Sequence, residues 1–96
     1  MEAHINILTN RPYSGKNFVE LEAAKQRFAF SQNVWGTFKQ FKSKGKSIKS
    51  GQHAAAHVFQ GFGTFTEKRV INGEEKFETV QRPLGFAPVF NIDQTK

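Results

Sequence analysis

The sequence predicts an α+β fold, with two helices packed on one face of a small antiparallel sheet and a protruding hairpin. Helix start signals occur at Asn17 and Thr37, in the first half of the chain. The second half holds the dipeptide Asn72-Gly73, which favours a two-residue hairpin turn, and an alternating apolar pattern over residues 84–92. A helical part followed by a strand-rich part is typical of the α+β class. The 96 residues suffice for one domain with a modest core.

The first helix is predicted over residues 17–30. Asn17 is a favourable N-cap, and Glu20 follows three residues later, as in a variant of the capping box. Residues 1–13, which precede this helix, are expected to form a strand or an extended arm. The apolar side chains of the helix recur at the spacing of one buried face: Leu21, Ala24 and Phe28, with Phe18 beside them.

A loop is expected over residues 31–36, followed by a short second helix. Thr37 and Gln40 form a full T-x-x-Q capping box at its start. Gly45 is a natural residue to end this helix, because glycine readily adopts the left-handed conformation found after many helices. Two rings would share the buried side of the helix: Phe38 and Phe41.

Strands are expected from Ala54 onward. Counting outward from the Asn72-Gly73 turn predicts a hairpin whose tip is polar and exposed and whose base alone is apolar. Pro88 places the last strand at a sheet edge or at a bulge, because proline cannot donate to a strand ladder. The predicted hairpin register pairs Ile71 with Glu74 and Phe65 with Val80.

The formal net charge of +6 at pH 7 is concentrated in one stretch of the chain. No acidic residue lies between Glu22 and Glu67, and part of the charge falls in a polar, basic loop expected over residues 43–52. A positive field of this kind favours polyanions and predicts nucleic-acid binding. The cations of the acid-free stretch are Lys25, Arg27, Lys39, Lys42, Lys44, Lys46 and Lys49.

The aromatic residues are eleven Phe, one Trp and one Tyr, more than a core of this size usually holds. Rings left exposed in a basic field are what stacking on unpaired bases requires, although burial in the core is the prediction for each individual Phe. Charge and rings together predict sequence-independent binding of a single-stranded nucleic acid, through phosphate contacts and base stacking. These residues do not separate DNA from RNA as the partner.

The candidate nucleic-acid-binding residues are the cations and the aromatic residues next to them. Trp35, just before the second helix, either stacks on a base or packs in the core. Tyr13 beside Arg11 leaves the same two alternatives open, whereas Asn17 and Gln40 are expected to cap helices. The full set is Arg11, Tyr13, Lys16, Trp35, Lys39, Lys42, Lys44, Lys46, Lys49 and His53.

Several other function classes are disfavoured by what the chain lacks. No window approaches the roughly 18 apolar residues of a membrane helix, and no signal-peptide pattern occurs. The absence of cysteine excludes disulfides and suits a cytoplasmic protein. His53 and His57 lack the glutamate and the third ligand of a helical zinc site, so no metal is expected. With no nucleophile–base pair, phosphate-binding loop or paired carboxylates, we expect neither a cofactor nor enzymatic activity.

Four segments, in order over about residues 6–95, resemble the N-terminal domain of ArdC-type antirestriction proteins. The third is the weakest match, with Ser and Gln where the family has charge. The resemblance implies a sequence-independent single-stranded DNA-binding domain, encoded on plasmids, conjugative elements or phages and related to the N-terminal region of conjugative-plasmid primases. It also implies antirestriction, by coating DNA that enters a cell unpaired. Full-length members continue into a zinc metalloprotease-like domain, which has no counterpart in this sequence. The four segments are Arg11-Pro12-Tyr13-Ser14-Gly15-Lys16-Asn17, Trp35-Gly36-Thr37-Phe38-Lys39-Gln40, Lys49-Ser50-Gly51-Gln52-His53 and Phe90-Asn91-Ile92-Asp93-Gln94.

The alternative function is that of an architectural double-stranded DNA-binding protein. Residues 61–65, with the sequence G-F-G-T-F, resemble the G-F-G-x-F of the bacterial HU family. HU-type arms are basic and carry a proline wedge for the minor groove. The arm expected here, residues 66–79, contains four glutamates that a minor groove would repel. A DNA-mimicking inhibitor of restriction enzymes is disfavoured as well, because such a protein must be acidic.

Overall fold

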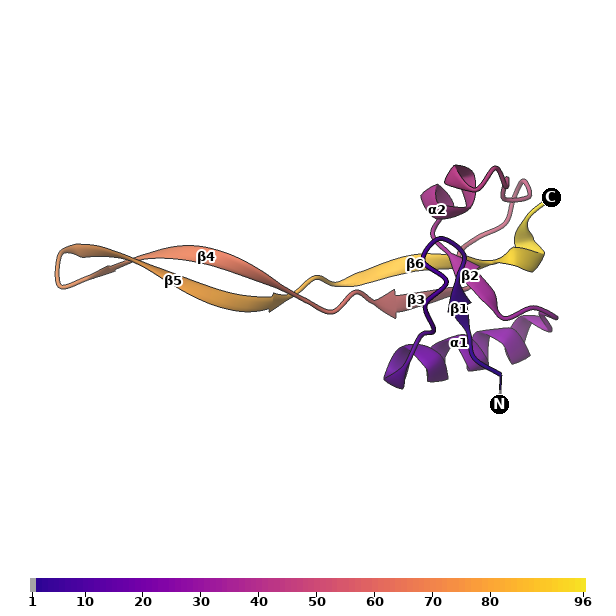
Figure 1. Cartoon of the computed structure of the whole chain (residues 1–96), viewed down its shortest axis with the longest axis horizontal. Helices are drawn as coiled ribbons and strands as arrows, with labels where there is room; N and C mark the ends of the chain where they lie inside the picture. Colours follow the sequence, from indigo (N-terminus) through magenta and orange to yellow (C-terminus); the bar gives the residue numbers. More distant parts are fainter. Residues whose placement is uncertain (1) are drawn as a thin grey trace.

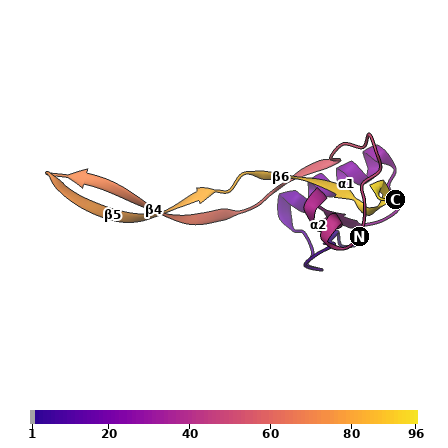
Figure 2. The ribbon, with the colours of Figure 1, turned by 90° about the horizontal axis from the view of Figure 1, so that it is seen from above.

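The molecule consists of a body from which a two-stranded arm projects (Figure 1). The computed structural model describes residues 2–96, with principal extents of 59 × 28 × 22 Å. Figure 2 shows from above that the arm extends away from both helices. Two helices and mostly antiparallel strands confirm the predicted α+β class. In chain order the elements are β1 (Ile5–Asn6), α1 (Gly15–Phe28), β2 (Val34–Gly36), α2 (Phe38–Ser43), β3 (Ala56–Phe59), β4 (Phe62–Ile71), β5 (Glu74–Pro83), β6 (Phe86–Asn91) and the 3₁₀ turn η1 (Ile92–Gln94).

A four-stranded sheet in the order β1-β2-β6-β3 forms the centre of the body. β2 and β3 both run antiparallel to β6, whereas β1 runs parallel to β2. This parallel pair, where an antiparallel sheet was expected, follows from the connection: α1 crosses between β1 and β2, as parallel neighbours require. The loop expected over residues 31–36 was wrong in part, because Val34–Gly36 is a strand too short to show an alternating pattern.

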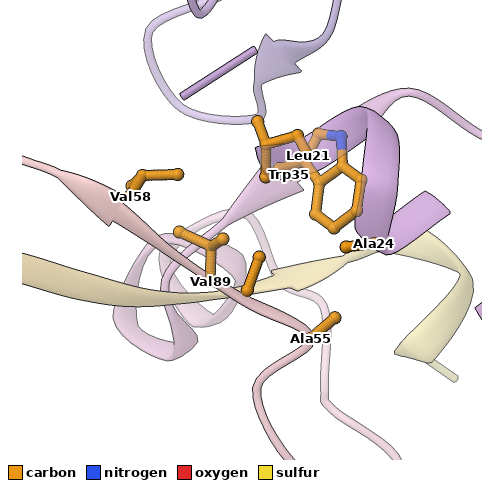
Figure 3. Packing of buried hydrophobic residues seen from close by; sticks show 7 residues of the cluster. Leu21, Ala24, Trp35, Ala55, Val58 and Val89 are labelled. Atoms are coloured by element: carbon orange, nitrogen blue, oxygen red, sulfur yellow. The ribbon is translucent and has the colours of Figure 1, made fainter. Parts of the chain in front are cut away.

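α1 covers one face of this sheet. Its residues Leu21 and Ala24 are buried as predicted, whereas Phe28 is half exposed at the end of the helix. The buried pair packs against side chains that reach the same face from β2, from β6, and from β3 and the residue before it (Figure 3). This cluster is the hydrophobic core, in which burial of each large apolar side chain stabilises the fold by about 1.5–3 kcal/mol. Its other members are Trp35, Ala55, Ala56, Val58 and Val89.

α2 lies on the opposite face of the sheet, so the prediction that both helices share one face was wrong (Figure 1). A Cβ atom on Gly36 would meet side-chain atoms of Ile7 and Phe41 at 2.6 and 3.3 Å, which places α2 over this side of β2. Trp35, the preceding residue, points to the other side, because neighbours along a strand alternate between faces. Within residues 2–96, no helix is long and apolar enough to cross a membrane.

Trp35 is completely buried in the core, so a base cannot stack on it and that alternative was wrong. Its indole Nε1 donates to Nδ1 of His4 at 2.8 Å, and Nε2 of His4 lies 3.0 Å from Oε2 of Glu22 on α1. A ring nitrogen that accepts an N–H bond carries no proton, so His4 holds its proton on Nε2 and donates it to Glu22. These bonds satisfy the buried indole and join β2, the N-terminal segment and α1.

α1 begins at Gly15, two residues earlier than predicted, and Asn17 does not cap it. The amide of Asn17 instead bonds the backbone of Phe59: Nδ2 donates to the carbonyl at 2.9 Å, and Oδ1 accepts from the N–H at 2.8 Å. β3 is an edge strand, so these backbone groups have no strand partner on that side. Because buried backbone polar groups must be paired, the Asn17 amide takes the place of a neighbouring strand and fixes the start of α1 to the end of β3.

The arm is the hairpin predicted from Asn72-Gly73, and β4 and β5 form a two-stranded sheet of their own. Both turn residues have positive φ, 52° and 76°, as a type I′ turn requires. The tip is exposed, as expected. The register is confirmed, with Ile71 opposite Glu74 and Phe65 opposite Val80.

We predict that Trp35→Phe destabilises the protein although most of the apolar volume remains. Nδ1 of His4 is then left buried without a donor, which should cost about 1–3 kcal/mol. Trp35→Ala also opens a cavity and should cost about 3–5 kcal/mol. Urea unfolding followed by circular dichroism measures both values. An Ala variant as stable as the parent protein would contradict the core role of this residue.

Candidate nucleic-acid interface

α2 is short and is held at both ends by hydrogen bonds. Oγ1 of Thr37 accepts the backbone N–H of Gln40 at 3.2 Å, and Oε1 of Gln40 accepts the N–H of Thr37 at 2.9 Å, so the predicted capping box is confirmed. The helix also ends where predicted, because Gly45 has a φ of 75° and its N–H bonds the carbonyl of Lys42 at 3.0 Å. These bonds fix the position of both ends of the α2 backbone.

Five lysines, which we call the basic segment, lie on α2 and on the loop after it. Phe41 occupies the inner side of the helix and is completely buried. Nζ of Lys49 donates to the backbone carbonyl of Asp93 at 3.3 Å. Within residues 2–96, no lysine of this segment forms an ion pair with a carboxylate. The basic segment comprises the exposed Lys39, Lys42, Lys44 and Lys49 and the half-buried Lys46.

The loop that carries Arg11 is tied to α2 by the buried side chain of Asn6. Nδ2 of Asn6 donates to Oη of Tyr13 at 2.8 Å and to Oε1 of Gln40 at 2.9 Å. The backbone N–H of Asn6 donates to the carbonyl of Arg11 at 3.0 Å. Oδ1 of Asn6 accepts the backbone N–H groups of Leu8 and Thr9. The side-chain amide thus uses its full hydrogen-bonding capacity, and the exposed Arg11 lies on a loop held by these bonds.

Tyr13 is half-buried and packs against the core cluster. Burial raises the pKa of its hydroxyl above the ordinary value, and the hydrogen bond from Asn6 acts in the opposite direction. These contacts favour the structural alternative for Tyr13 over base stacking.

The sheet face on the α2 side is only partly covered, because α2 has six residues. The helix lies over β2 and reaches β6 through Phe38 and Phe90, whose ring centroids are 6.4 Å apart. Over β3 and the rest of β6, alternate side chains point away from the core into solvent. We call this area the open face, formed by His57, Phe59, Phe86, Pro88 and Phe90.

Aromatic rings gather at the end of the open face that adjoins the arm. The ring centroid of Phe59 lies 5.5 Å from that of Phe86 and 5.3 Å from that of Phe62, the first residue of β4. Phe86 is 66% exposed and Phe62 is 65% exposed. Two accessible rings therefore lie against a third that is half-buried, an arrangement suited to stacking on bases.

A groove of about 610 Å³ borders these rings where the open face meets the first turns of α1. Lys16 lines it and is exposed. The structure therefore places cations on two sides of the open face, Lys16 on one and the basic segment on the other. The other residues that line the groove are Ser14, Asn17, Glu20, His57, Phe59 and Phe86.

His53 does not join the open face. It lines a second hollow of about 370 Å³ with Phe28 and Phe30, which shares no residue with the groove. His57 lies in the strand β3, so the two histidines do not share a helix. Among residues 2–96, no three His, Asp or Glu side chains gather as metal ligands would.

The exposed phenylalanines are the site residues that sequence reasoning missed. Of the eleven Phe, all within the described residues, only Phe41 is fully buried, so the expectation of burial was wrong for most of them. Phe38, expected on the buried side of its helix, is 54% exposed. The alternation of Phe86, Pro88 and Phe90 is visible in the sequence, but which face stays uncovered depends on where α2 packs.

The arm contributes no net charge. β4 and β5 hold four basic and four acidic side chains, so the formal +6 belongs to the body. In the part of the chain that the structure describes, every ion pair of a lysine or arginine lies in the arm. These pairs are Lys68 with Glu75 at 2.7 Å, Arg69 with Glu78 at 3.4 Å, and Arg82 with Glu67.

Fold and site together define a small α+β domain with a cationic body, an open aromatic sheet face and a neutral arm. A family model described as the N-terminal domain of anti-restriction factor ArdC matches residues 1–91, and the chain belongs to this family. The metal-free crystal structure of the antirestriction ArdC protein from the R388 plasmid is similar, with a TM-score of 0.77 and 25% sequence identity. The match covers 99% of this chain and 32% of that chain, so this chain spans about a third of that protein. No curated protein matches the chain.

We predict that Gln40→Ala destabilises the protein more than Thr37→Ala does. Loss of the Thr37 cap should cost about 1 kcal/mol. Gln40→Ala keeps the bond from the backbone N–H of residue 40 to Thr37, but it removes Oε1, which accepts from the N–H of Thr37 and from the buried Asn6 amide. The unpaired N–H of Asn6 should cost about 1–3 kcal/mol. Urea unfolding of the two variants side by side measures the difference. Equal costs would show that the bond from Asn6 to Gln40 does not hold α2 in place.

Proposed function

We propose that this domain binds single-stranded DNA without sequence preference, with phosphates along the basic segment and bases against the open face. The observation that carries the proposal is the cluster of accessible rings on the α2 side of the sheet, with the exposed Lys16 lining the adjoining groove and the basic segment on α2 and the loop after it. Aromatic platforms in a positive groove are the usual means of binding single strands regardless of sequence. Lys16 lines the groove beside the same rings, and Arg11 lies on the loop that Asn6 ties to α2.

Phosphate contacts by unpaired cations account for affinity without base preference. Each contact releases condensed counterions from the nucleic acid, whatever its sequence. Within the described residues, the lysines and arginines of the body are free of ion pairs, whereas three of the four in the arm are paired. The body, rather than the arm, therefore attracts the polyanion.

Accessible rings favour unpaired bases over duplex DNA, because a duplex hides base faces between neighbouring pairs. Phe86 and Phe90 point to the same side of β6, and a strand rises about 3.4 Å per residue, so their Cα atoms are about 13–14 Å apart. Open sheets of comparable size in RNA-binding domains stack two or three bases. RNA offers the same phosphates and base faces, and we expect it to compete with DNA.

The HU-like alternative finds little support in the arm. β4 and β5 are neutral overall, and the turn between them is Asn72-Gly73 without a proline. Insertion into a minor groove calls for a basic arm with an apolar wedge at its tip. Glu74 and Glu75, next to the turn, would face the phosphates instead.

The proposed biological role is antirestriction by occupancy. A domain that coats plasmid or phage DNA while it enters the cytoplasm unpaired would keep restriction enzymes from that DNA, without a catalytic step of its own. Membership of the ArdC N-terminal family supports this role, and the structurally similar R388 protein is itself described as antirestriction.

Oligo-dT should bind with micromolar or tighter affinity at low salt, and the affinity should fall steeply as salt rises. If four or five phosphates are neutralised, the slope of log K against log salt should be about −3 to −3.5, from about −0.7 per contact. Fluorescence anisotropy of a labelled oligonucleotide gives the slope, with a duplex of equal length as the comparison. A salt-independent affinity, or tighter binding to the duplex, would refute the proposal.

Replacing Lys39, Lys42 and Lys44 together by Ala should weaken binding about equally for all base sequences and flatten the salt slope by about two to three contacts. All three side chains are exposed, so the fold should persist in circular dichroism. The matched control replaces the same three residues by Arg, which keeps the charge and should keep the slope. Unchanged binding by a folded Ala variant would show that these lysines do not contact the phosphates of the bound strand.

A further inference from the structure

The groove beside Phe86 contains a group that phosphate binding does not explain. Its walls are the rings of Phe59 and Phe86 on one side and the first turns of α1 on the other. Lys16 and Glu20 are one helical turn apart on that second wall, so both border the same space. A carboxylate repels phosphate, so Glu20 does not fit a groove that receives phosphate alone.

Glu20 has no structural partner that accounts for its position. Glu22 bonds His4, and Asp93 accepts the backbone N–H and the hydroxyl of Ser31. Within residues 2–96, by contrast, Glu20 forms neither an ion pair nor a side-chain hydrogen bond. Its carboxylate is therefore free to accept hydrogen bonds from a ligand in the groove.

A nucleobase matches this combination of groups. Its flat face can stack on Phe86, its phosphate can meet Lys16, and its edge then faces the wall that holds Glu20. Guanine, cytosine and adenine each present an exocyclic amino group, whose N–H can donate a hydrogen bond to a carboxylate. Thymine has no amino group: its edge presents two carbonyl oxygens with one N–H between them. It is therefore the poorest hydrogen-bond partner for the Glu20 carboxylate.

We propose that the groove holds one unpaired nucleotide of the bound strand, stacked on Phe86 and read by Glu20, with thymine disfavoured. The inference rests on the proposed single-stranded DNA binding and adds one position of base preference to it. No residue of the open face itself carries a carboxylate. The preference should therefore be modest and confined to a single nucleotide.

The stacking part is tested with a pair of equally exposed phenylalanines. Phe86→Ala should weaken binding of a labelled oligo-dT of about 15 nucleotides by about tenfold, whereas Phe86→Tyr keeps a ring and should bind like the parent. Phe77→Ala is the matched control, because Phe77 is 69% exposed but lies on the arm, outside the groove. Circular dichroism checks that each variant is folded.

The base-reading part is tested by a ratio of affinities. An oligo-dT with a central dG should bind about fivefold tighter than oligo-dT alone, and Glu20→Gln should bring that ratio close to one. Glu2→Gln is the matched control: it removes the same charge from an exposed site outside the groove and should leave the ratio unchanged. The ratio is insensitive to any general gain in affinity from the lost charge.

The outcomes separate this inference from the proposed function. Absence of oligo-dT binding by the parent protein would refute both. Binding that Phe86→Ala and Phe77→Ala affect equally would overturn the groove as a stacking site and leave the proposed function standing. A dG-to-dT ratio of one in the parent, or one that Glu20→Gln leaves unchanged, would overturn the role of Glu20.

Discussion

α2 ends after six residues because the left-handed conformation of Gly45 returns backbone N–H groups to the last helical turn. A helix of this length covers β2 and the adjoining end of β6, but it does not reach β3. The other face of the same sheet is closed by the fourteen residues of α1. The domain thus has one face that builds the core and one that remains half open. The exposure of the rings on the open face follows from this difference in helix length, and the start of α1 adds the groove beside them.

The residues that carry the family resemblance are mostly structural in this fold. Trp35 bonds His4 in the core, the Asn17 amide bonds the edge of β3, and Thr37 and Gln40 cap α2. Asn91 and Gln94 form a second capping box at η1, where Gln94 also donates to the carbonyl of His53. The same segments also contain residues proposed to border the bound strand: Arg11, Lys16, Lys39, Lys49 and Phe90. The shared motifs therefore combine scaffold residues with part of the proposed interface.

Sequence reasoning succeeded where local chemistry decides the structure. The Asn72-Gly73 turn determines the hairpin register, and the capping box and Gly45 determine both ends of α2. It failed where distant contacts decide. Asn17 has the properties of an N-cap, yet it bonds Phe59, 42 residues away. Trp35 could not be assigned to core or surface, and burial was wrongly predicted for most phenylalanines, because exposure depends on which sheet face each helix covers.

The central claim is that single-stranded DNA binds to the open face, rather than to the arm or to the outer surface of α1. Titration of isotopically labelled protein with oligo-dT, followed by backbone amide chemical shifts in NMR spectra, tests it directly. The account predicts that the largest shift changes fall in β3, β6, α2 and the first turn of α1, and that the tip of the arm is unaffected. Changes concentrated in β4 and β5, or around the hollow that His53 lines, would contradict it.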